Sequence, residues 1–228
     1  MPAIGVWQVS RHFHRNPFLL ALYRQYLKDQ DSGAFVRKAA GCYSQGTLQR
    51  LVEHDGRIVR RAAVLALGLL GDYEANSALG KALQDEDRTV RMMADNAIRS
   101  VWTRVGTQEQ REQLQAILRL NLAQQFQEAV RRAAELLKTI PWFAEAWNQR
   151  AIAHFALGRY REAIHDCHQA LEINPYHFAA AAGMGQAQLQ LGDQSSALES
   201  FRRALRLNPD LEAVRVQIAR LSRRIEGR

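Results

Sequence analysis

The chain has 228 residues, of which 47% are hydrophobic and 24% charged, a composition typical of a folded globular protein and not of a disordered one. Its longest apolar run, Ala62 to Leu70, is too short to cross a bilayer, so we expect no membrane span. The formal charge of +8 is shared between residues 1–105, with 15 basic and 10 acidic residues, and residues 106–228, with 16 and 13, which excludes a basic tail.

In residues 1–32 we expect an N-terminal arm followed by one capping helix. The arm carries no basic segment followed by an apolar one, so no secretory signal is visible and we expect a cytoplasmic protein. A helix is predicted from Pro17 to Lys28, with Asn16 as its N-cap and the proline at its first position. We expect this helix to cover the open end of the following units with an apolar face made of Phe18, Leu19, Leu22, Tyr26 and Leu27.

A first type of repeat runs through residues 33–105. The pairs that recur at one fixed spacing are Val59 and Val90, Arg60 and Arg91, Ala63 and Ala94, Ala66 and Ala97, and Leu48 and Leu79. The acidic turn Asp85-Glu86-Asp87 precedes the second copy, where a carboxylate caps the first turn of a helix. The pattern therefore predicts two helical hairpins, and Val36 to Gly41 looks like a shortened earlier copy.

These units resemble HEAT-type repeats, in which the arginine of the second helix usually pairs with a neighbouring acidic turn. The resemblance implies an α-solenoid. Arginine makes up 27 of the 31 basic residues, which either reflects codon usage or supplies a basic face for phosphate or carboxylate groups. The second interpretation gives a candidate nucleic-acid stripe of Arg57, Arg60, Arg61, Arg88 and Arg91, extended by Arg99 and Arg104.

A different and slightly longer period governs the C-terminal half. It is carried by Pro141, Pro175 and Pro209, by Ala129, Ala163 and Ala197, and by Leu137, Leu171 and Leu205. A period of about 34 residues indicates stacked helical hairpins. Thr107 and Gln110 form a candidate capping box where this second repeat type begins. Because no flexible linker separates the two repeat types, we expect one continuous, elongated and curved rod.

The unit Ala144 to His177 resembles a tetratricopeptide repeat at Trp147, Ala151, Gly158, Tyr160, Ala163, Ala170 and Pro175. The glycine is expected to end the first helix in the left-handed conformation, and the proline to end the second. We expect three units in residues 107–228, at 110–143, 144–177 and 178–211, of which the first is degenerate. Residues 212–226 then predict a capping helix with one apolar stripe and several arginines on its other faces.

In tetratricopeptide repeats the first helix of each unit lines the concave side. Carried onto this chain, that rule predicts a peptide-binding groove made by Arg111, Leu114, Leu118, Asn121, Glu145, Asn148, Ile152, Phe155, Gln186 and Leu189. Co-chaperones of this superfamily clamp a terminal carboxylate with Lys, Asn and Arg side chains. The five corresponding positions here are Leu114, Leu118, Gln149, Ala179 and Gly183, which all differ, so the groove suits an apolar peptide or amphipathic helix instead.

Catalytic motifs do not emerge from the sequence: it has no Gly-x-Ser-x-Gly, no phosphate loop and no His-Glu-x-x-His. Cys42 and Cys167 are isolated thiols, as in a reducing compartment. His165 and His168 are close together in one predicted helix, but the repeat register places both outward, so we expect no metal site and no cofactor.

The sequence therefore predicts a non-enzymatic scaffold that binds a protein or peptide partner in the concave groove. The same groove could instead be filled by residues 1–16 of this chain. The alternative function is nucleic-acid binding through the arginine stripe of the HEAT-like half.

Overall fold

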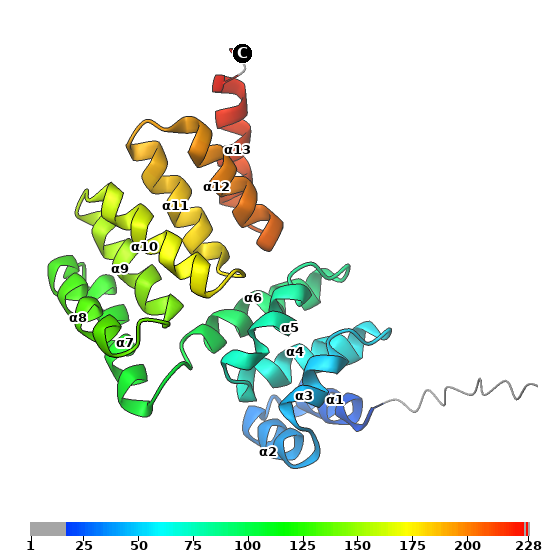
Figure 1. Cartoon of the computed structure of the whole chain (residues 1–228). Coiled ribbons are helices and arrows are strands. Elements are labelled where there is room, and N and C mark those ends of the chain that lie inside the picture. Colours follow the sequence, from blue (N-terminus) through cyan, green and yellow to red (C-terminus); the bar gives the residue numbers. More distant parts are fainter. Residues whose placement is uncertain (1–16, 226, 228) are drawn as a thin grey trace, which may run out of the picture.

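The computed structural model of the chain describes residues 17–225 and 227, and this part is helical with no strand. The predicted all-α class is confirmed (Figure 1). The expected cap at Asn16, and any occupation of the groove by residues 1–16, lie outside the described residues. No helix of the described range has both the length and the apolar character that a bilayer crossing needs.

The N-terminal half consists of α1 to α6, which share one hydrophobic core. The first repeat corresponds to α4 and α6, the long second helices of two hairpins, whose partners α3 and α5 are short. The elements are α1 (Phe18–Asp29), α2 (Ser32–Cys42), α3 (Gln45–Leu51), α4 (Arg57–Leu70), the 3-10 turn η1 (Tyr73–Ala75), α5 (Asn76–Ala82) and α6 (Arg88–Trp102).

Helix α1 packs on α4 with most of the predicted face: Leu19 and Leu22 are buried, and Tyr26 packs against the core. Phe18 and Leu27, expected in the core, are 56% and 52% exposed. The buried side chains of α1 are Leu19, Leu20, Leu22 and Tyr23. The prediction was wrong for Phe18 and Leu27 because the helix turns Leu20 and Tyr23 toward the core in their place.

The C-terminal half is a series of antiparallel helix pairs with the predicted longer period. Gly158 and Gly192 follow the first helices of the second and third pairs with φ of +73° and +80°, so the left-handed ending expected at Gly158 is confirmed. The Thr107–Gln110 capping box is also confirmed. The elements are α7 (Gln108–Leu122), α8 (Phe126–Thr139), α9 (Ala144–Ala156), α10 (Tyr160–Ile173), α11 (Phe178–Gln190), α12 (Gln194–Leu207) and α13 (Glu212–Ile225).

The two halves do not continue as one elongated rod. The chain turns at α7 and α8, and the ends of α10 and α12 come back against α5 and α6 (Figure 1). Phe178, the first residue of α11, is fully buried and belongs to the core cluster of the N-terminal half. The expectation of an extended rod is therefore wrong, because polar and aromatic residues at the ends of the tetratricopeptide-type units have partners in the N-terminal half.

A buried joint of two amides and two rings makes the first of these contacts. The side chain of Asn76 donates to Oδ1 of Asn174 at 2.9 Å and accepts from Nε1 of Trp102 at 2.7 Å. The Trp102 ring stacks on His177, with 4.0 Å between ring centroids. Both amides and the indole N–H have hydrogen-bond partners inside the core. Separation of the two halves would break these bonds, and each of these groups that stayed buried would then lack a partner.

The next unit of the array makes an equivalent contact. Asn208 donates to Asp95 at 2.7 Å, and the amide of Gln84 donates to the carbonyl oxygens of Arg206 and Leu207 at 2.7 and 3.0 Å. Asn174 and Asn208 occupy matching positions, since both are C-caps that precede a proline. The same Asn-Pro turn therefore serves the contact between the halves twice.

The joint predicts an unusual outcome for a glycine substitution. Alanine normally stabilises a helix by about 0.5–1 kcal/mol relative to glycine. A methyl group at Gly80 in α5, however, would collide with the Tyr176 ring, which packs on that helix from the other half. We expect Gly80→Ala to destabilise the protein by about 1–3 kcal/mol, the range for overpacking, in urea unfolding.

The matched control is Gly41→Ala, at a helical glycine with no atom within 4 Å of the added methyl group. It should stabilise the protein by the ordinary helix increment. Equal effects of the two variants would show that α5 and Tyr176 are not packed together in solution.

Candidate functional site

An apolar cavity of about 200 Å³ lies between α9 and α11 on the predicted concave side. Four of the predicted groove residues line it, namely Asn148, Ile152, Phe155 and Gln186. The remaining lining residues are small or apolar: Ala151, Ala163, Cys167, Ala179 and Gly183. Ile152 is 44% exposed, an unusual value for a large aliphatic side chain in a hollow.

Local packing holds this cavity open. The ring of Phe155 rests edge-on against Tyr160, with 5.4 Å between centroids. Gly183 leaves room at the wall, since a methyl group there would lie 3.4 Å from Sγ of Cys167. Burial raises the pKa of the Cys167 thiol to about 12, so this group is a neutral apolar surface at physiological pH and not a nucleophile.

Three predicted groove residues are buried. Leu114 is fully buried in the core of α7 to α9. Glu145 and Asn148 are only 7% and 6% exposed. Leu189 is half-buried against the core of the last units and keeps part of its surface exposed. The assignment of Leu114 was wrong because the first unit is degenerate, and α7 turns this leucine inward together with Ile117.

Glu145 instead belongs to a buried polar cluster beside the joint. Its Oε2 lies 2.9 Å from Nε2 of His177, and its Oε1 accepts from Gln149 at 2.6 Å. His177 accepts the N–H of Ala180 at Nδ1, so Nε2 carries the proton and donates to the carboxylate. Burial acts to raise the pKa of Glu145, but the bonds from His177, Gln149 and Asn148 outweigh it, and the pKa is lowered.

The groove end formed by α7 is polar and bonded internally. Arg111 donates to the carbonyl oxygen of Gly106 at 2.8 Å. Asn121 donates to both the backbone and the side-chain oxygen of Gln149 at 2.9 Å, and its own Oδ1 is buried without a partner among the described residues. Leu118 is half-buried on the adjacent core. Of the predicted groove, the section between α9 and α11 is the part that lines a cavity.

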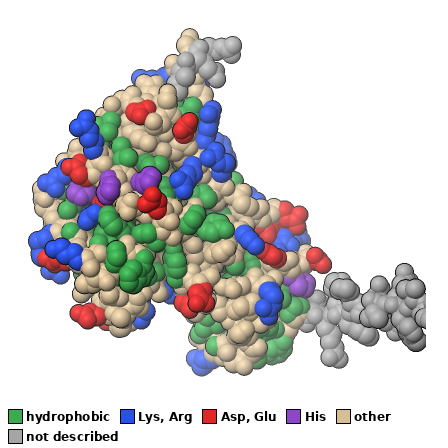
Figure 2. Space-filling view, in the orientation of Figure 1, with side chains coloured by type: hydrophobic (Ala, Val, Ile, Leu, Met, Phe, Trp, Pro, Cys, Tyr) green, Lys and Arg blue, Asp and Glu red, His purple; other side chains and the backbone are tan. Residues whose placement is uncertain are grey.

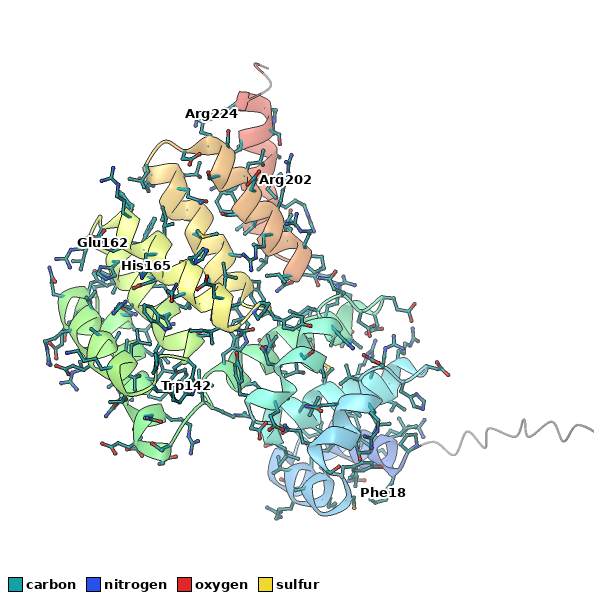
Figure 3. All side chains as sticks on the ribbon, viewed as in Figure 1. Phe18, Trp142, Glu162, His165, Arg202 and Arg224 are labelled. Carbon is teal, nitrogen blue, oxygen red and sulfur yellow. The ribbon has the colours of Figure 1, made fainter. Side chains whose placement is uncertain are left out.

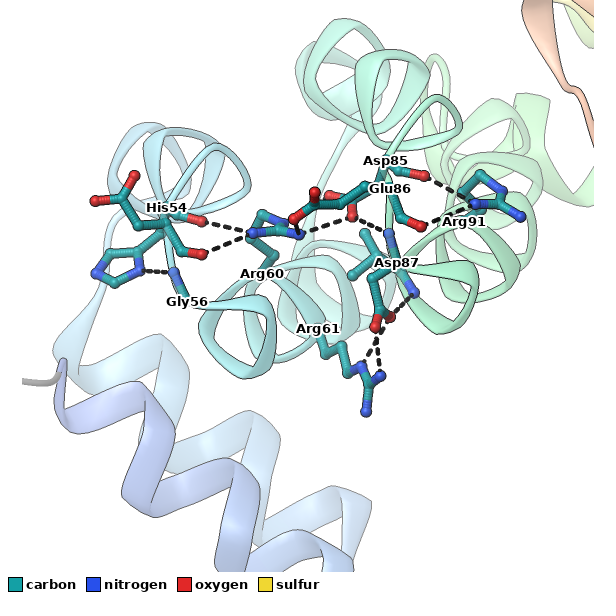
Figure 4. A network of polar contacts seen from close by, with 10 residues as sticks. His54, Gly56, Arg60, Arg61, Asp85, Glu86, Asp87 and Arg91 are labelled. Carbon is teal, nitrogen blue, oxygen red and sulfur yellow. Dashed lines mark hydrogen bonds and ion pairs between the residues drawn. The ribbon is translucent and has the colours of Figure 1, made fainter.

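The arginines of the predicted nucleic-acid stripe are mostly engaged within the protein (Figure 4). Arg60 is 7% exposed; its guanidinium donates to Asp85 at 2.7 and 2.9 Å and to Glu86 at 3.0 Å. Its Nη1 donates to the carbonyl oxygens of His54 and Asp55. All the nitrogen atoms that Arg60 could offer to phosphate already have partners.

Arg91 occupies the matching position in the next unit and repeats this arrangement. Its Nη1 donates to the carbonyl oxygens of Asp85 and Glu86, as that of Arg60 does to the preceding turn. Its carboxylate partner, however, comes from the other half of the protein: Asp210 accepts at 2.9 and 3.1 Å. Asp210, in the turn after α12, therefore has for Arg91 the role that Asp85 has for Arg60.

Of the other candidate arginines, Arg61 is bonded to Asp87 at 3.0 and 2.6 Å. Arg99 is paired with Asp95, and Arg104 donates to two carbonyl oxygens of α4 and its cap. Arg57 and Arg88 remain exposed at the starts of α4 and α6. Two exposed arginines do not form a continuous stripe.

His165 and His168 are only partly covered on the outer side of α10, away from the cavity lining. Within residues 17–225 and 227, no three His, Cys, Asp or Glu side chains lie close enough together to hold a metal ion.

Sequence reasoning missed the joint made by Asn76, Trp102, Asn174 and His177. One signal was present, since Asn174-Pro175 and Asn208-Pro209 occupy the same place in successive repeats. An asparagine before two of the three periodic prolines indicates a capping role, but it does not indicate which other helix receives the side chain.

Comparison with protein families supports both repeat types. Residues 144–177 and 178–211 each match a tetratricopeptide repeat model, with the unit boundaries that the sequence predicted. A model of HEAT repeats matches residues 44–138. That match extends over α7 and most of α8, which the sequence analysis assigned to a degenerate first tetratricopeptide unit.

Curated relatives align with part of the chain. A TPR repeat-containing protein of Rhizobium etli is 31% identical over 93 residues, covering 41% of this chain and 46% of that protein. The small glutamine-rich tetratricopeptide repeat-containing protein 2 of Saccharomyces cerevisiae is 30% identical over 82 residues, covering 36% of this chain and 24% of that protein. The chain thus spans less than half the length of these relatives.

Solved structures confirm the fold of the C-terminal half. The first TPR of Spaghetti (RPAP3) bound to an HSP90 peptide has a TM-score of 0.51 and 20% identity, over 54% of this chain and 97% of that chain. The Sgt2 TPR domain from Aspergillus fumigatus has a TM-score of 0.51 and 19% identity, over 54% of this chain and 82% of that chain.

The arginine network predicts a pH-dependent contribution from Asp87. This carboxylate accepts from Arg61 and also caps α6 by accepting from the N–H of Val90. The Arg61 bond and the capping bond lower its pKa to about 2 from a usual 3.8. A lowered carboxyl pKa stabilises the fold above the usual pKa, and this stabilisation is lost as the pH falls through the folded value.

We therefore expect Asp87→Asn, which keeps a capping oxygen, to cost about 2 kcal/mol at pH 7, from about 1.4 kcal/mol per pKa unit. In urea unfolding from pH 7 to pH 3, the difference from wild type should shrink below about pH 4. Asp193→Asn is the control, since Asp193 caps α12 from an exposed position and the described chain bonds no guanidinium to it. A difference that stays constant with pH would contradict the assignment.

Proposed function

We propose that this chain, which carries HEAT and tetratricopeptide repeats, is a non-enzymatic scaffold that binds a peptide segment of a partner protein between α9 and α11. The observation that carries the proposal is the apolar cavity there, with Ile152 44% exposed inside it. An exposed aliphatic side chain in a hollow gains free energy when a partner's apolar side chain displaces water from it, by about 25 cal/mol per Å² buried.

The chemistry of the cavity indicates what kind of peptide it accepts. The Spaghetti structure is named as bound to an HSP90 peptide, which supports a peptide as the ligand of this fold. The five clamp positions of the co-chaperones are occupied here by Leu114, Leu118, Gln149, Ala179 and Gly183, none of which carries a positive charge. The groove therefore suits an apolar or amphipathic segment, with Gln186 as the polar side chain of the lining that could contact it.

Binding without catalysis agrees with the groups around the cavity. The titratable side chain in its lining is Cys167, whose raised pKa keeps it protonated. Glu145 and His177, the nearest acid–base pair described above, are buried and bonded to each other. A general acid or base must reach the substrate, and these side chains are engaged in the joint.

The alternative, nucleic-acid binding by the HEAT-like half, has no comparable support. Arg60, Arg61 and Arg91 are held by carboxylates, and an arginine must leave such a partner before it contacts phosphate.

The test is a change of charge inside the cavity. Ile152→Glu places a carboxylate in the groove without disturbing a buried contact, whereas Phe155→Glu would also remove the Tyr160 contact. Peptides selected from a displayed random library on the wild-type protein should contain apolar residues at spaced positions. Their binding, measured by fluorescence polarisation with synthetic copies, should weaken at least tenfold in Ile152→Glu.

Leu191→Glu is the matched control, because Leu191 is 46% exposed and lies after α11, outside the lining of the cavity. It should bind the selected peptides as the wild type does. Failure to select any peptide, or equal weakening by the two variants, would refute the site.

A further inference from the structure

Acidic residues nearly balance basic ones in residues 17–193, with 19 against 21, but not in the two helices that follow. Along α8, Arg131 and Arg132 are bonded to Glu128, and Arg131 also to Glu135. Arg150 on α9 is bonded to Asp166. In the N-terminal half, five arginines have carboxylate or carbonyl partners: Arg60, Arg61, Arg91, Arg99 and Arg104.

Helices α12 and α13 differ from this pattern. Residues 194–225 contain seven arginines and only three acidic residues. Two of those acids are already used, Asp210 by Arg91 and Glu212 by Arg215. Five exposed arginines of these two helices have no carboxylate partner in the described chain, and we call them the C-terminal arginine ridge: Arg202, Arg206, Arg220, Arg223 and Arg224.

The spacing of these residues places them in two short rows. Arg202 and Arg206 are one helical turn apart on α12, and Arg223 and Arg224 lie one turn beyond Arg220 on α13, so each set shares a helix face. The two helices pack side by side at the end of the array (Figure 1). Figure 2 shows basic side chains gathered over them, and Figure 3 labels Arg202 and Arg224 within this region.

The apolar side of α13 is already occupied. Val214 and Leu221 are buried in the core cluster that contains Phe201 of α12. Val216 is the one exposed large apolar side chain in the described part of α13, at 42%, and a single such side chain gives a lipid bilayer little to bury. The ridge therefore presents positive charge beside very little apolar surface.

We propose that the C-terminal arginine ridge binds the phosphodiester backbone of a nucleic acid, at a site separate from the peptide groove. Arginine offers paired N–H donors that match the oxygens of a phosphate group. A phosphodiester backbone repeats its negative charge along its length, so one strand can contact several arginines of the ridge. The cavity between α9 and α11 is lined by other helices, so the two sites do not overlap.

The proposal predicts how steeply the binding constant should fall as the salt concentration rises. Neutralisation of Z phosphates of duplex DNA gives a slope of log K against log salt of about −0.9 Z. Five arginines therefore predict a slope of about −4.5, and each arginine removed should reduce its size by about one.

The experiment measures binding of a fluorescein-labelled 20-base-pair duplex and of its single strand to the full chain from 50 to 200 mM KCl. R202Q/R206Q should weaken binding at least tenfold at 50 mM and reduce the size of the slope by about two. R131Q/R132Q is the matched control: it removes the same charge from exposed arginines that are held by glutamates, and it should leave both quantities near wild type. Circular dichroism checks that both variants keep their helicity.

Three results would overturn the proposal. The first is an absence of duplex and single-strand binding at 50 mM KCl. The second is equal weakening by R202Q/R206Q and R131Q/R132Q, which would assign binding to net charge and not to the ridge. The third is stronger binding to vesicles made of phosphatidylserine and phosphatidylcholine in a one-to-two ratio, or equal competition by polyglutamate, which would assign the ridge to lipid or to acidic protein. The peptide-selection experiment is unaffected by any of these results.

Discussion

The structure depends on one buried polar joint between its two repeat arrays. Asn76, Asn174 and the indole N–H of Trp102 satisfy one another in the core, and His177 stacks on the indole while it donates to Glu145. Such a network is stabilising only when it is complete, because a buried amide that loses its partner costs about 1–3 kcal/mol. The joint therefore specifies a single angle between the halves, whereas an apolar contact of the same area would allow several.

The joint also limits the extent of the proposed groove. Glu145 and Phe178, at the starts of α9 and α11, are buried next to the joint. The cavity lies further along α9, where Asn148, Ile152 and Phe155 line it. The proposed binding site therefore begins where the contact between the repeat arrays stops.

The repeat architecture could be predicted from the sequence because it is periodic. Prolines, alanines and leucines at a constant spacing report local helix pairing, and family models place two units at the same boundaries. The fold-back could not be predicted, since the contact of Asn76 with Asn174 joins residues 98 positions apart that follow different periods. The groove was partly predicted. Ile152 and Phe155 follow the repeat register, but Leu114 belongs to the degenerate unit, where that register does not decide which face is buried.

The same residue type has two different roles in this chain, and geometry separates them. In α4 and α6, Arg60 and Arg91 occupy matching positions and act as internal cross-links: Arg60 pairs with Asp85 of the following turn, and Arg91 pairs with Asp210 of the second array. Along α12 and α13, the described chain supplies no carboxylate partner to residues such as Arg202 and Arg220. Solubility does not explain a row of one sign, because a surface of mixed charges keeps a protein soluble equally well. The proposed binding of an anionic partner rests on this difference between paired and unpaired arginines.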